Sequence, residues 1–190
     1  MRGQRLASAS AGGLDFPIRG YSGMWSGAML DLLRSGKDYI RAAGSLGWGF
    51  PAALGAKLAV PAWPVLLFSG DGGFWYHLSE LETAVRWNIN AVLLVNNNKS
   101  INQEMDIVKN AYGGSLEGNY GDLWKFRDVS FCALAESIGA KGIRVEKPSE
   151  IGSALEQAFS CKSPCVVGVM SDLRAIAPGG KHNWKVTLDS

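Results

Sequence analysis

The chain has 190 residues, of which 47% are hydrophobic and 19% are charged, with a net charge of +2. This apolar content excludes a mainly disordered chain, and the charge pattern shows no basic stripe of the kind that binds nucleic acid. No apolar run reaches the roughly 18–20 residues that span a membrane. Three cysteines do not make the disulfide framework of a secreted domain, so we expect reduced thiols and a cytoplasmic location.

In chain order, the first 19 residues show no period, and we predict an irregular lead there. The spacing of apolar residues then predicts helices over 21–34, 50–60, 78–87, 129–138 and 149–159. Short apolar runs predict strands over 39–43, 65–69, 91–95, 142–145 and 165–170, with glycine-rich turns at 44–49 and 70–73. Residues 106–127 contain several glycines and no period, which predicts a mostly irregular segment, with room for one short helix, that is functional or mobile. Residues 176–190 form a predicted tail.

Strand, turn and helix repeat in the same order along the chain. This repeat favours parallel strands joined by right-handed crossovers. We therefore predict one α/β domain over residues 20–175, with a doubly wound, mainly parallel sheet and helices on both of its faces. Ligands of such sheets bind beyond the carboxyl ends of the strands, so the turns at those ends are the candidate site.

Two polar turns follow successive apolar strands. Gly70-Asp71-Gly72-Gly73 lies between a strand and a helix, where free N–H groups favour a phosphate, but an aspartate suits a phosphate only if a divalent cation lies between them. Residues 96–98 are three asparagines that end the next strand. Oxygen atoms of Asp71 and Asn98 are ligands that Mg²⁺ uses together with phosphates. Taken alone, the first turn is also explained by Asp71 acting as a helix cap, and the second by asparagines acting as turn formers.

The combination of motifs is more specific. The turn around Asp71, the segment Glu80-Leu81-x-Thr83-Ala84 and the asparagines resemble the C-terminal cofactor domain of thiamine-diphosphate-dependent enzymes of the acetolactate synthase-like group. Residues 44–56 and 20–25 resemble two further motifs of that group, so the resemblance covers about residues 18–172. It implies the thiamine diphosphate (ThDP) binding fold, ThDP and Mg²⁺ as cofactors, and a lyase or carboligase that decarboxylates a 2-oxo acid substrate.

The resemblance also implies roles for individual residues. The metal ligands would be Asp71, the side-chain oxygen of Asn98 and the backbone carbonyl of Ser100. Leu46 would support the thiazolium ring and bend the cofactor, which makes it the candidate catalytic residue. The other cofactor contacts would be Gly20, Tyr21, Ser22, Gly44, Gly72, Gly73, Ile101 and Asn102.

Some features depart from this family. Ile18 stands where the family has an aspartate, Pro17 disfavours a central strand there, and Tyr21-Ser22 replaces the Gln-His of acetolactate synthases. The family's activating glutamate lies on a pyrimidine-binding domain, in a longer chain or a partner subunit. We therefore expect a fragment, or one subunit of a split homo- or hetero-oligomeric enzyme, that is inactive alone.

Two alternatives remain open. The chain is otherwise a non-catalytic ThDP-binding or oligomerisation module, or a dinucleotide-binding oxidoreductase whose turn is Gly44-x-x-Gly47-x-Gly49. His77 and His182 and the three cysteines show no catalytic or zinc pattern. Three charged residues beyond the asparagines either line a substrate entrance or form a solvated face: Lys99, Glu104 and Asp106. Two tryptophans, Trp48 and Trp75, lie beside motif glycines.

Overall fold

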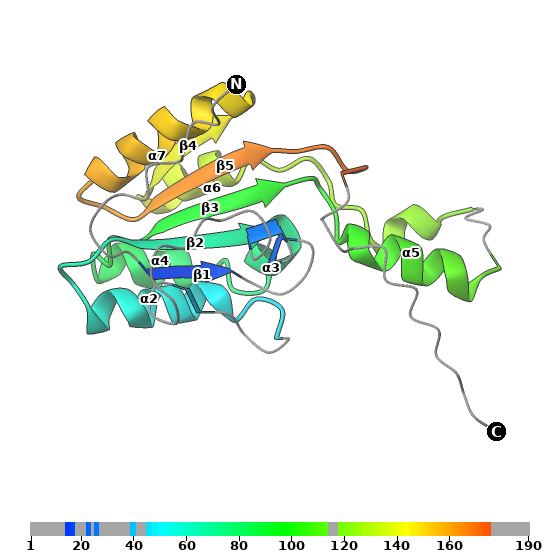
Figure 1. Cartoon of the computed structure of the whole chain (residues 1–190), viewed down its shortest axis with the longest axis horizontal. Helices are drawn as coiled ribbons and strands as arrows, with labels where there is room; N and C mark the ends of the chain where they lie inside the picture. Colours follow the sequence, from blue (N-terminus) through cyan, green and yellow to red (C-terminus); the bar gives the residue numbers. More distant parts are fainter. Residues whose placement is uncertain are drawn as a thin grey trace.

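The computed structural model describes residues 14–17, 22–23, 25–26, 39–40, 45–113 and 118–175. Its strands form one sheet in the order β1-β2-β3-β5-β4, and every neighbouring pair is parallel (Figure 1). The strands are β1 (Leu14–Pro17), β2 (Val65–Gly70), β3 (Val92–Asn97), β4 (Lys141–Val145) and β5 (Cys165–Met170). The predicted parallel α/β sheet is confirmed.

The described helices are α2 (Gly49–Ala59), α3 (Asp71–Trp75), α4 (Glu80–Arg86), α5 (Asn102–Ala111), α6 (Phe131–Ile138) and α7 (Ile151–Ser160), with 3₁₀ turns η1 (Tyr120–Leu123) and η2 (Pro148–Glu150). Helices α2, α3, α4, α6 and α7 pack on the two faces of the sheet, whereas α5 lies beyond the carboxyl ends of the strands (Figure 1). A large apolar cluster packs α2, α3, α4 and α6 on one face, around Phe50, Phe74 and Leu81. A smaller cluster packs α7 on the other face through Ala154 and Ala158. The predicted doubly wound arrangement is confirmed.

Alternation along the strands produces these two clusters. Leu67 and Leu93 pair across β2 and β3 and belong to the large cluster, whereas their neighbours Leu66 and Val92 face the smaller one. Successive side chains of a strand point to opposite faces, so a strand covered on both faces is apolar throughout. The continuous apolar runs in the sequence therefore indicated these strands correctly.

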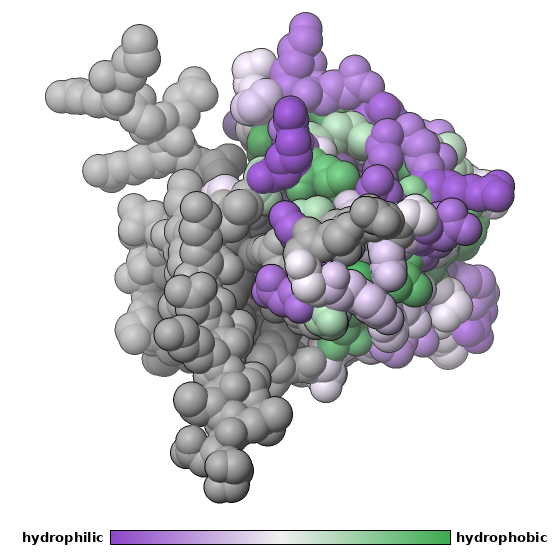
Figure 2. Space-filling view, turned by 90° about the vertical axis from the view of Figure 1, so that its right-hand side faces the viewer, coloured by the Kyte–Doolittle hydropathy of each residue, from purple (hydrophilic) through white to green (hydrophobic). Residues whose placement is uncertain are grey.

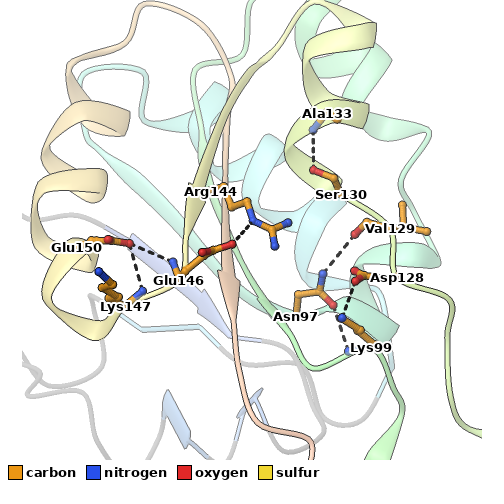
Figure 3. Close-up of polar contacts among 10 residues, drawn as sticks. All are labelled: Asn97, Lys99, Asp128, Val129, Ser130, Ala133, Arg144, Glu146, Lys147 and Glu150. Carbon is orange, nitrogen blue, oxygen red and sulfur yellow. Dashed lines mark hydrogen bonds and ion pairs between the residues drawn. The ribbon is translucent and has the colours of Figure 1, made fainter.

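Local signals set the ends of α6. The Ser130 hydroxyl oxygen accepts a hydrogen bond from the Ala133 N–H at 3.2 Å and so caps the start of the helix (Figure 3). Gly139 ends it with φ +97°, a left-handed conformation that glycine adopts without a steric penalty. Such helix limits were predictable because a capping residue and a glycine flank the apolar run.

Several expectations need correction. The lead was expected to be irregular, but Leu14–Pro17 forms an edge strand, a position that tolerates the missing N–H of proline. Residues 106–127 were expected to be mostly irregular, with room for one short helix; α5 includes 106–111, η1 follows, and Ser100 forms an antiparallel bridge with Lys125, which was not expected. Strand β3 extends through Asn97, because β5 continues to pair with it. The turn at 70–73 contains the first residues of α3.

Several other expectations fall outside the described residues: those on Gly20, Tyr21, Gly44 and the tail at 176–190. In the predicted helix at 21–34, Ser22, Gly23, Trp25 and Ser26 are described and are helical. The limits of the domain at 20 and 175 stay a prediction. Among the described residues, no helix combines the length and apolar character that crossing a membrane requires.

Candidate functional site

The two polar turns lie side by side at the carboxyl ends of β2 and β3. Gly70 pairs with Asn96 in the sheet, so Asp71 and Asn98 begin the connections that leave two neighbouring strands. Both side chains meet at one backbone amide. The Ser100 N–H donates to Asp71 Oδ2 at 2.9 Å and to Asn98 Oδ1 at 3.1 Å. The three residues predicted to hold a metal ion are therefore gathered in one place.

The carboxyl group of Asp71 is unusual for a charged group because only 2% of the residue is exposed. Burial raises its pKa to about 6, although hydrogen bonds from the N–H groups of Gly72 and Ser100 oppose the shift. In the described part of the chain, no lysine, arginine or histidine forms an ion pair with it. A cation bound here would supply the missing positive charge.

Two glycines let other segments approach this site closely. A Cβ atom on Gly70 would lie 2.7 Å from Ser22 Oγ, and one on Gly72 would lie 2.8 Å from Ile101 Cγ1. Distances this short are essentially never seen for real Cβ atoms, so these contacts require glycine. Ser22, which is 7% exposed, and Ile101 are thereby held against the turn that follows β2.

The glycine-rich turn before α2 lies beside the end of α3. Gly47 has φ +88°, and a Cβ atom there would lie 2.5 Å from Tyr76 Cβ and 2.8 Å from His77 Cδ2. Leu46 is half-buried and packs on the large apolar cluster. This turn is thus packed against protein at Gly47, which disfavours the alternative of an open dinucleotide-binding loop.

The segment after β3, which we call the metal turn (residues 97–101), has a strained backbone. Lys99 has φ +61°, and Asn88 is the only other non-glycine residue with positive φ in the described part of the chain. A left-handed conformation is unfavourable for lysine. The Lys99 N–H donates to Asn97 Oδ1 at 3.1 Å, which closes a tight turn directly before Ser100.

A second segment, which we call the strap (residues 124–129), holds the metal turn. The Ile101 N–H donates to the Trp124 carbonyl at 2.8 Å, and the Phe126 N–H donates to the Lys99 carbonyl at 2.7 Å. Figure 3 shows two side-chain contacts of the same pair of segments: Lys99 Nζ with Asp128 Oδ2 at 2.6 Å, and Asn97 Nδ2 with the Val129 carbonyl at 3.3 Å.

These bonds bear on the predicted diphosphate contacts. The Ile101 N–H is already occupied by Trp124, so Ile101 contributes to the site through its side chain, which lies against Gly72. The amide of Asn102 is buried and donates to the Leu173 carbonyl at 3.1 Å, after β5. Gly73 is buried in the first turn of α3. Gly73 and Ile101 therefore lie at the turn that follows β2, whereas the motif Glu80–Ala84 lies in α4, which packs on one face of the sheet.

The strap was missed by the reasoning from sequence. Its alternation of apolar Trp124, polar Lys125 and apolar Phe126 is a strand signal, but it spans too few residues to stand out in a glycine-rich region. Asp128 belongs to none of the motifs that the sequence shows. The left-handed backbone of Lys99 also had no signal, because glycine or asparagine is the residue expected at such a position.

The donors at this site suit Mg²⁺. Asp71 is a buried carboxylate with which no described basic side chain pairs, and Asn98 adds an amide oxygen. Hard oxygen donors of this kind, completed by phosphate oxygens and water, are typical of Mg²⁺. The described residues contain no cluster of three His, Cys, Asp or Glu side chains, which a transition metal would prefer.

Figure 2 views the molecule from the side toward which the strands of Figure 1 point. Green apolar surface is visible there between purple polar side chains.

Comparison with known proteins gives the family. The family described as thiamine pyrophosphate enzyme, C-terminal TPP binding domain, matches residues 19–169 (thiamine pyrophosphate is another name for ThDP). A probable acetolactate synthase large subunit of Methanococcus aeolicus is 35% identical over 143 residues, covering 73% of this chain and 23% of that protein. The acetolactate synthase large subunit of Haemophilus influenzae is 37% identical over 127 residues, covering 65% and 21%.

A third relative carries a different name. The 2-hydroxyacyl-CoA lyase of Arabidopsis thaliana is 31% identical over 152 residues, covering 75% of this chain and 25% of that protein. The chain thus spans about a quarter of the length of these relatives. Together with the buried carboxylate and the gathered motifs, these matches show that the chain belongs to the thiamine diphosphate enzymes, as a C-terminal ThDP-binding domain of the acetolactate synthase-like group whose cofactors are ThDP and Mg²⁺.

Proposed function

We propose that the carboxyl ends of β2 and β3 bind the Mg²⁺–diphosphate end of ThDP. The observation that carries this proposal is that the side-chain oxygens of Asp71 and Asn98 both accept hydrogen bonds from the Ser100 amide. Asp71 is also buried, and no described lysine, arginine or histidine pairs with it. A buried carboxylate without a counter-charge is unfavourable, and its persistence is understandable if a metal ion binds there.

Each residue then has a role. Asp71 Oδ, Asn98 Oδ1 and the Ser100 carbonyl hold the metal ion, and Gly72 and Gly73 leave room for the diphosphate beside the first turn of α3. Leu46 supports the thiazolium ring from the turn before α2. We assign further diphosphate and ring contacts to Gly20, Tyr21, Ser22, Gly44, Ile101 and Asn102.

When bound, ThDP supplies a nucleophilic carbon and an electron sink for cleaving the bond next to a carbonyl group. The protein's own contribution is to bind the cofactor, to neutralise the charge of its diphosphate and to orient its ring. The metal ligands offset the charge of the diphosphate, and Leu46 excludes water from one face of the ring site. We propose a 2-oxo acid as the substrate, with decarboxylation followed by transfer to a second carbonyl, because the relatives include acetolactate synthases.

This activity requires a pyrimidine-binding domain, which the match at residues 19–169 does not include. We propose that such a domain reaches the β2–β3 edge either in a longer chain or in a partner subunit of a homo- or hetero-oligomer. We place it in the cytoplasm, because Cys132, Cys161 and Cys165 are all free thiols.

The binding proposal is tested by calorimetry of the 190-residue chain with ThDP, in Mg²⁺ and in excess chelator. We expect saturable binding that disappears with the chelator. ThDP affinity that is unchanged by the chelator, or an affinity for NADH equal to that for ThDP, would contradict the assigned metal site.

The catalytic proposal needs a second experiment. The chain with ThDP, Mg²⁺ and pyruvate is assayed for CO₂ and acetolactate, alone and with an added pyrimidine domain of a relative. We expect no turnover alone and turnover with the added domain. Multiple turnovers by the chain alone would show that an activating acid lies within these residues. Cofactor binding without turnover in either case would favour a non-catalytic ThDP-binding module.

A further inference from the structure

The strap (residues 124–129) and the metal turn (residues 97–101) are far apart in sequence but bound together by several contacts. Two backbone hydrogen bonds join them, and so do one ion pair and one side-chain hydrogen bond, both drawn in Figure 3. The same contacts flank Lys99, whose backbone is in the left-handed region. An unfavourable conformation persists only where its surroundings hold it.

We propose that the strap positions the metal turn for Mg²⁺ binding, and that Asp128 is a positioning residue that acts through Lys99. This inference rests on the proposed function. Lys99 lies between Asn98 and Ser100, so its backbone angles decide where the Asn98 side chain and the Ser100 carbonyl point. The strap bonds Lys99 at two places, its carbonyl and its ammonium group.

The strap also reaches the turn that follows β2. A Cβ atom on Gly72 would lie 3.6 Å from Phe126 Cε2 as well as 2.8 Å from Ile101 Cγ1. Phe126 therefore contacts the neighbourhood of Gly72 with its ring while its N–H holds Lys99. One short segment thus connects both turns of the proposed site, and its displacement would change both together.

The effect of the strap is expected on metal affinity rather than on folding. The ion pair is largely solvated, with side-chain exposures of 39% for Lys99 and 61% for Asp128. Exposed pairs contribute little to stability. Residues that orient metal ligands, however, commonly change metal affinity by roughly 10–100-fold when they are altered.

The first test compares Asp128→Asn with Glu82→Gln. Glu82 pairs with Arg86 at 3.0 Å on α4, and both side chains are exposed, so this is a matched ion pair away from the strap. We expect Asp128→Asn to raise the Mg²⁺ midpoint of ThDP binding about threefold to tenfold, with an unchanged melting temperature in the absence of ligands. Glu82→Gln should change neither.

A double-mutant cycle shows whether Asp128 acts through Lys99. Lys99→Asn removes the ammonium group but suits the left-handed backbone. Once Lys99 is asparagine, Asp128→Asn should change the Mg²⁺ midpoint by less than about twofold. Additive effects of the two substitutions would overturn the role assigned to Asp128.

The backbone bond is tested by Phe126→Pro against Phe126→Ala. Both remove the ring, but only proline removes the N–H that donates to the Lys99 carbonyl. We expect the proline variant to bind Mg²⁺ about tenfold more weakly than the alanine variant. Hydrogen exchange at the Ile101 amide, measured without cofactor, should be slow in the unaltered chain and in Phe126→Ala, and faster in Phe126→Pro.

The outcomes separate this inference from the proposed function. If the unaltered chain binds ThDP with Mg²⁺ but Asp128→Asn and Phe126→Pro match their controls, the strap has no positioning role. If the unaltered chain shows no Mg²⁺-dependent binding, the proposed function fails and the strap's role fails with it. Fast exchange at Ile101 in the unaltered chain overturns the strap by itself, whatever the cofactor does.

Discussion

The corner between α6 and β4 and the metal turn both contain a residue in the left-handed conformation, but they differ in whether that residue suits it. At the corner between α6 and β4, the left-handed position is a glycine, Gly139, and the start of the helix is capped by Ser130. At the metal turn, the left-handed position is Lys99, and the nearby carboxyl group of Asp71 is buried without a described cation. The first region is stable with its own residues, whereas the second is held in an unfavourable arrangement that a ligand would relieve.

The metal ligands provide the largest test of this contrast. We expect Asp71→Ala and Asn98→Ala each to weaken Mg²⁺-dependent ThDP binding by at least about 100-fold, since each removes a direct oxygen ligand. Calorimetry measures the affinity, and circular dichroism checks that the fold persists. Glu82→Gln, which alters an exposed pair with Arg86 on α4, is the control and should bind normally. Unchanged affinity in either ligand variant would remove that residue from the site.

The pH dependence of stability follows from the raised pKa of Asp71. Its pKa of about 6 in the folded chain lies above the ordinary aspartate pKa of 3.8, so the folded state binds the proton more tightly than the unfolded state. The stabilisation from this group is therefore complete below pH 3.8 and is lost as pH rises through about 6. Without ligands, the difference amounts to at most about 3 kcal/mol.

The measurement is urea unfolding of the unaltered chain and of Asp71→Asn from pH 4 to 7.5. The unaltered chain should lose stability relative to the variant between about pH 4 and 6. Added Mg²⁺ and ThDP should reverse this loss, because the metal ion favours the carboxylate. Parallel pH profiles for the two proteins would contradict the raised pKa.

The ring site gives a smaller effect. In a complete enzyme, Leu46→Ala should lower turnover by about 10–100-fold while the affinity for ThDP changes by less than about threefold, because the ring is misplaced rather than released. Leu58→Ala, at an exposed position of α2, serves as the control. Wild-type turnover in the Leu46 variant would reject its role, and an equal loss of affinity would make it a simple binding contact.

The smallest effects come from two glycines, one at the proposed site and one in a helix away from it. Gly72→Ala should lower stability by about 1 kcal/mol and weaken ThDP binding, because its Cβ would lie 2.8 Å from Ile101 Cγ1. Gly152→Ala, in α7 with no atom within 4 Å of the added Cβ, should raise stability by about 0.5–1 kcal/mol. Thermal unfolding measures both, and changes of the same sign would remove the contrast between the regions.

The sequence by itself was sufficient for much of the fold and for the adjacency of Asp71 and Asn98. Continuous apolar runs indicated β2, β3 and β5, because strands covered on both faces need apolar residues at every position. The same logic placed Asp71 and Asn98 at adjacent strand ends, which the pairing of β2 with β3 confirms. These features depend on local periodicity and on the topology rules that follow from it.

Only the tertiary structure decided the rest. The extension of β3 through Asn97 depends on pairing with β5, which lies far along the chain, and pairing of this kind overrides the poor strand propensity of asparagine. The strap and the length of the helix at Asn102–Ala111 were likewise missed in a glycine-rich segment without a period. The burial of Asp71 and the left-handed Lys99 arise from contacts among segments separated in sequence, and no local pattern of residues encodes such contacts.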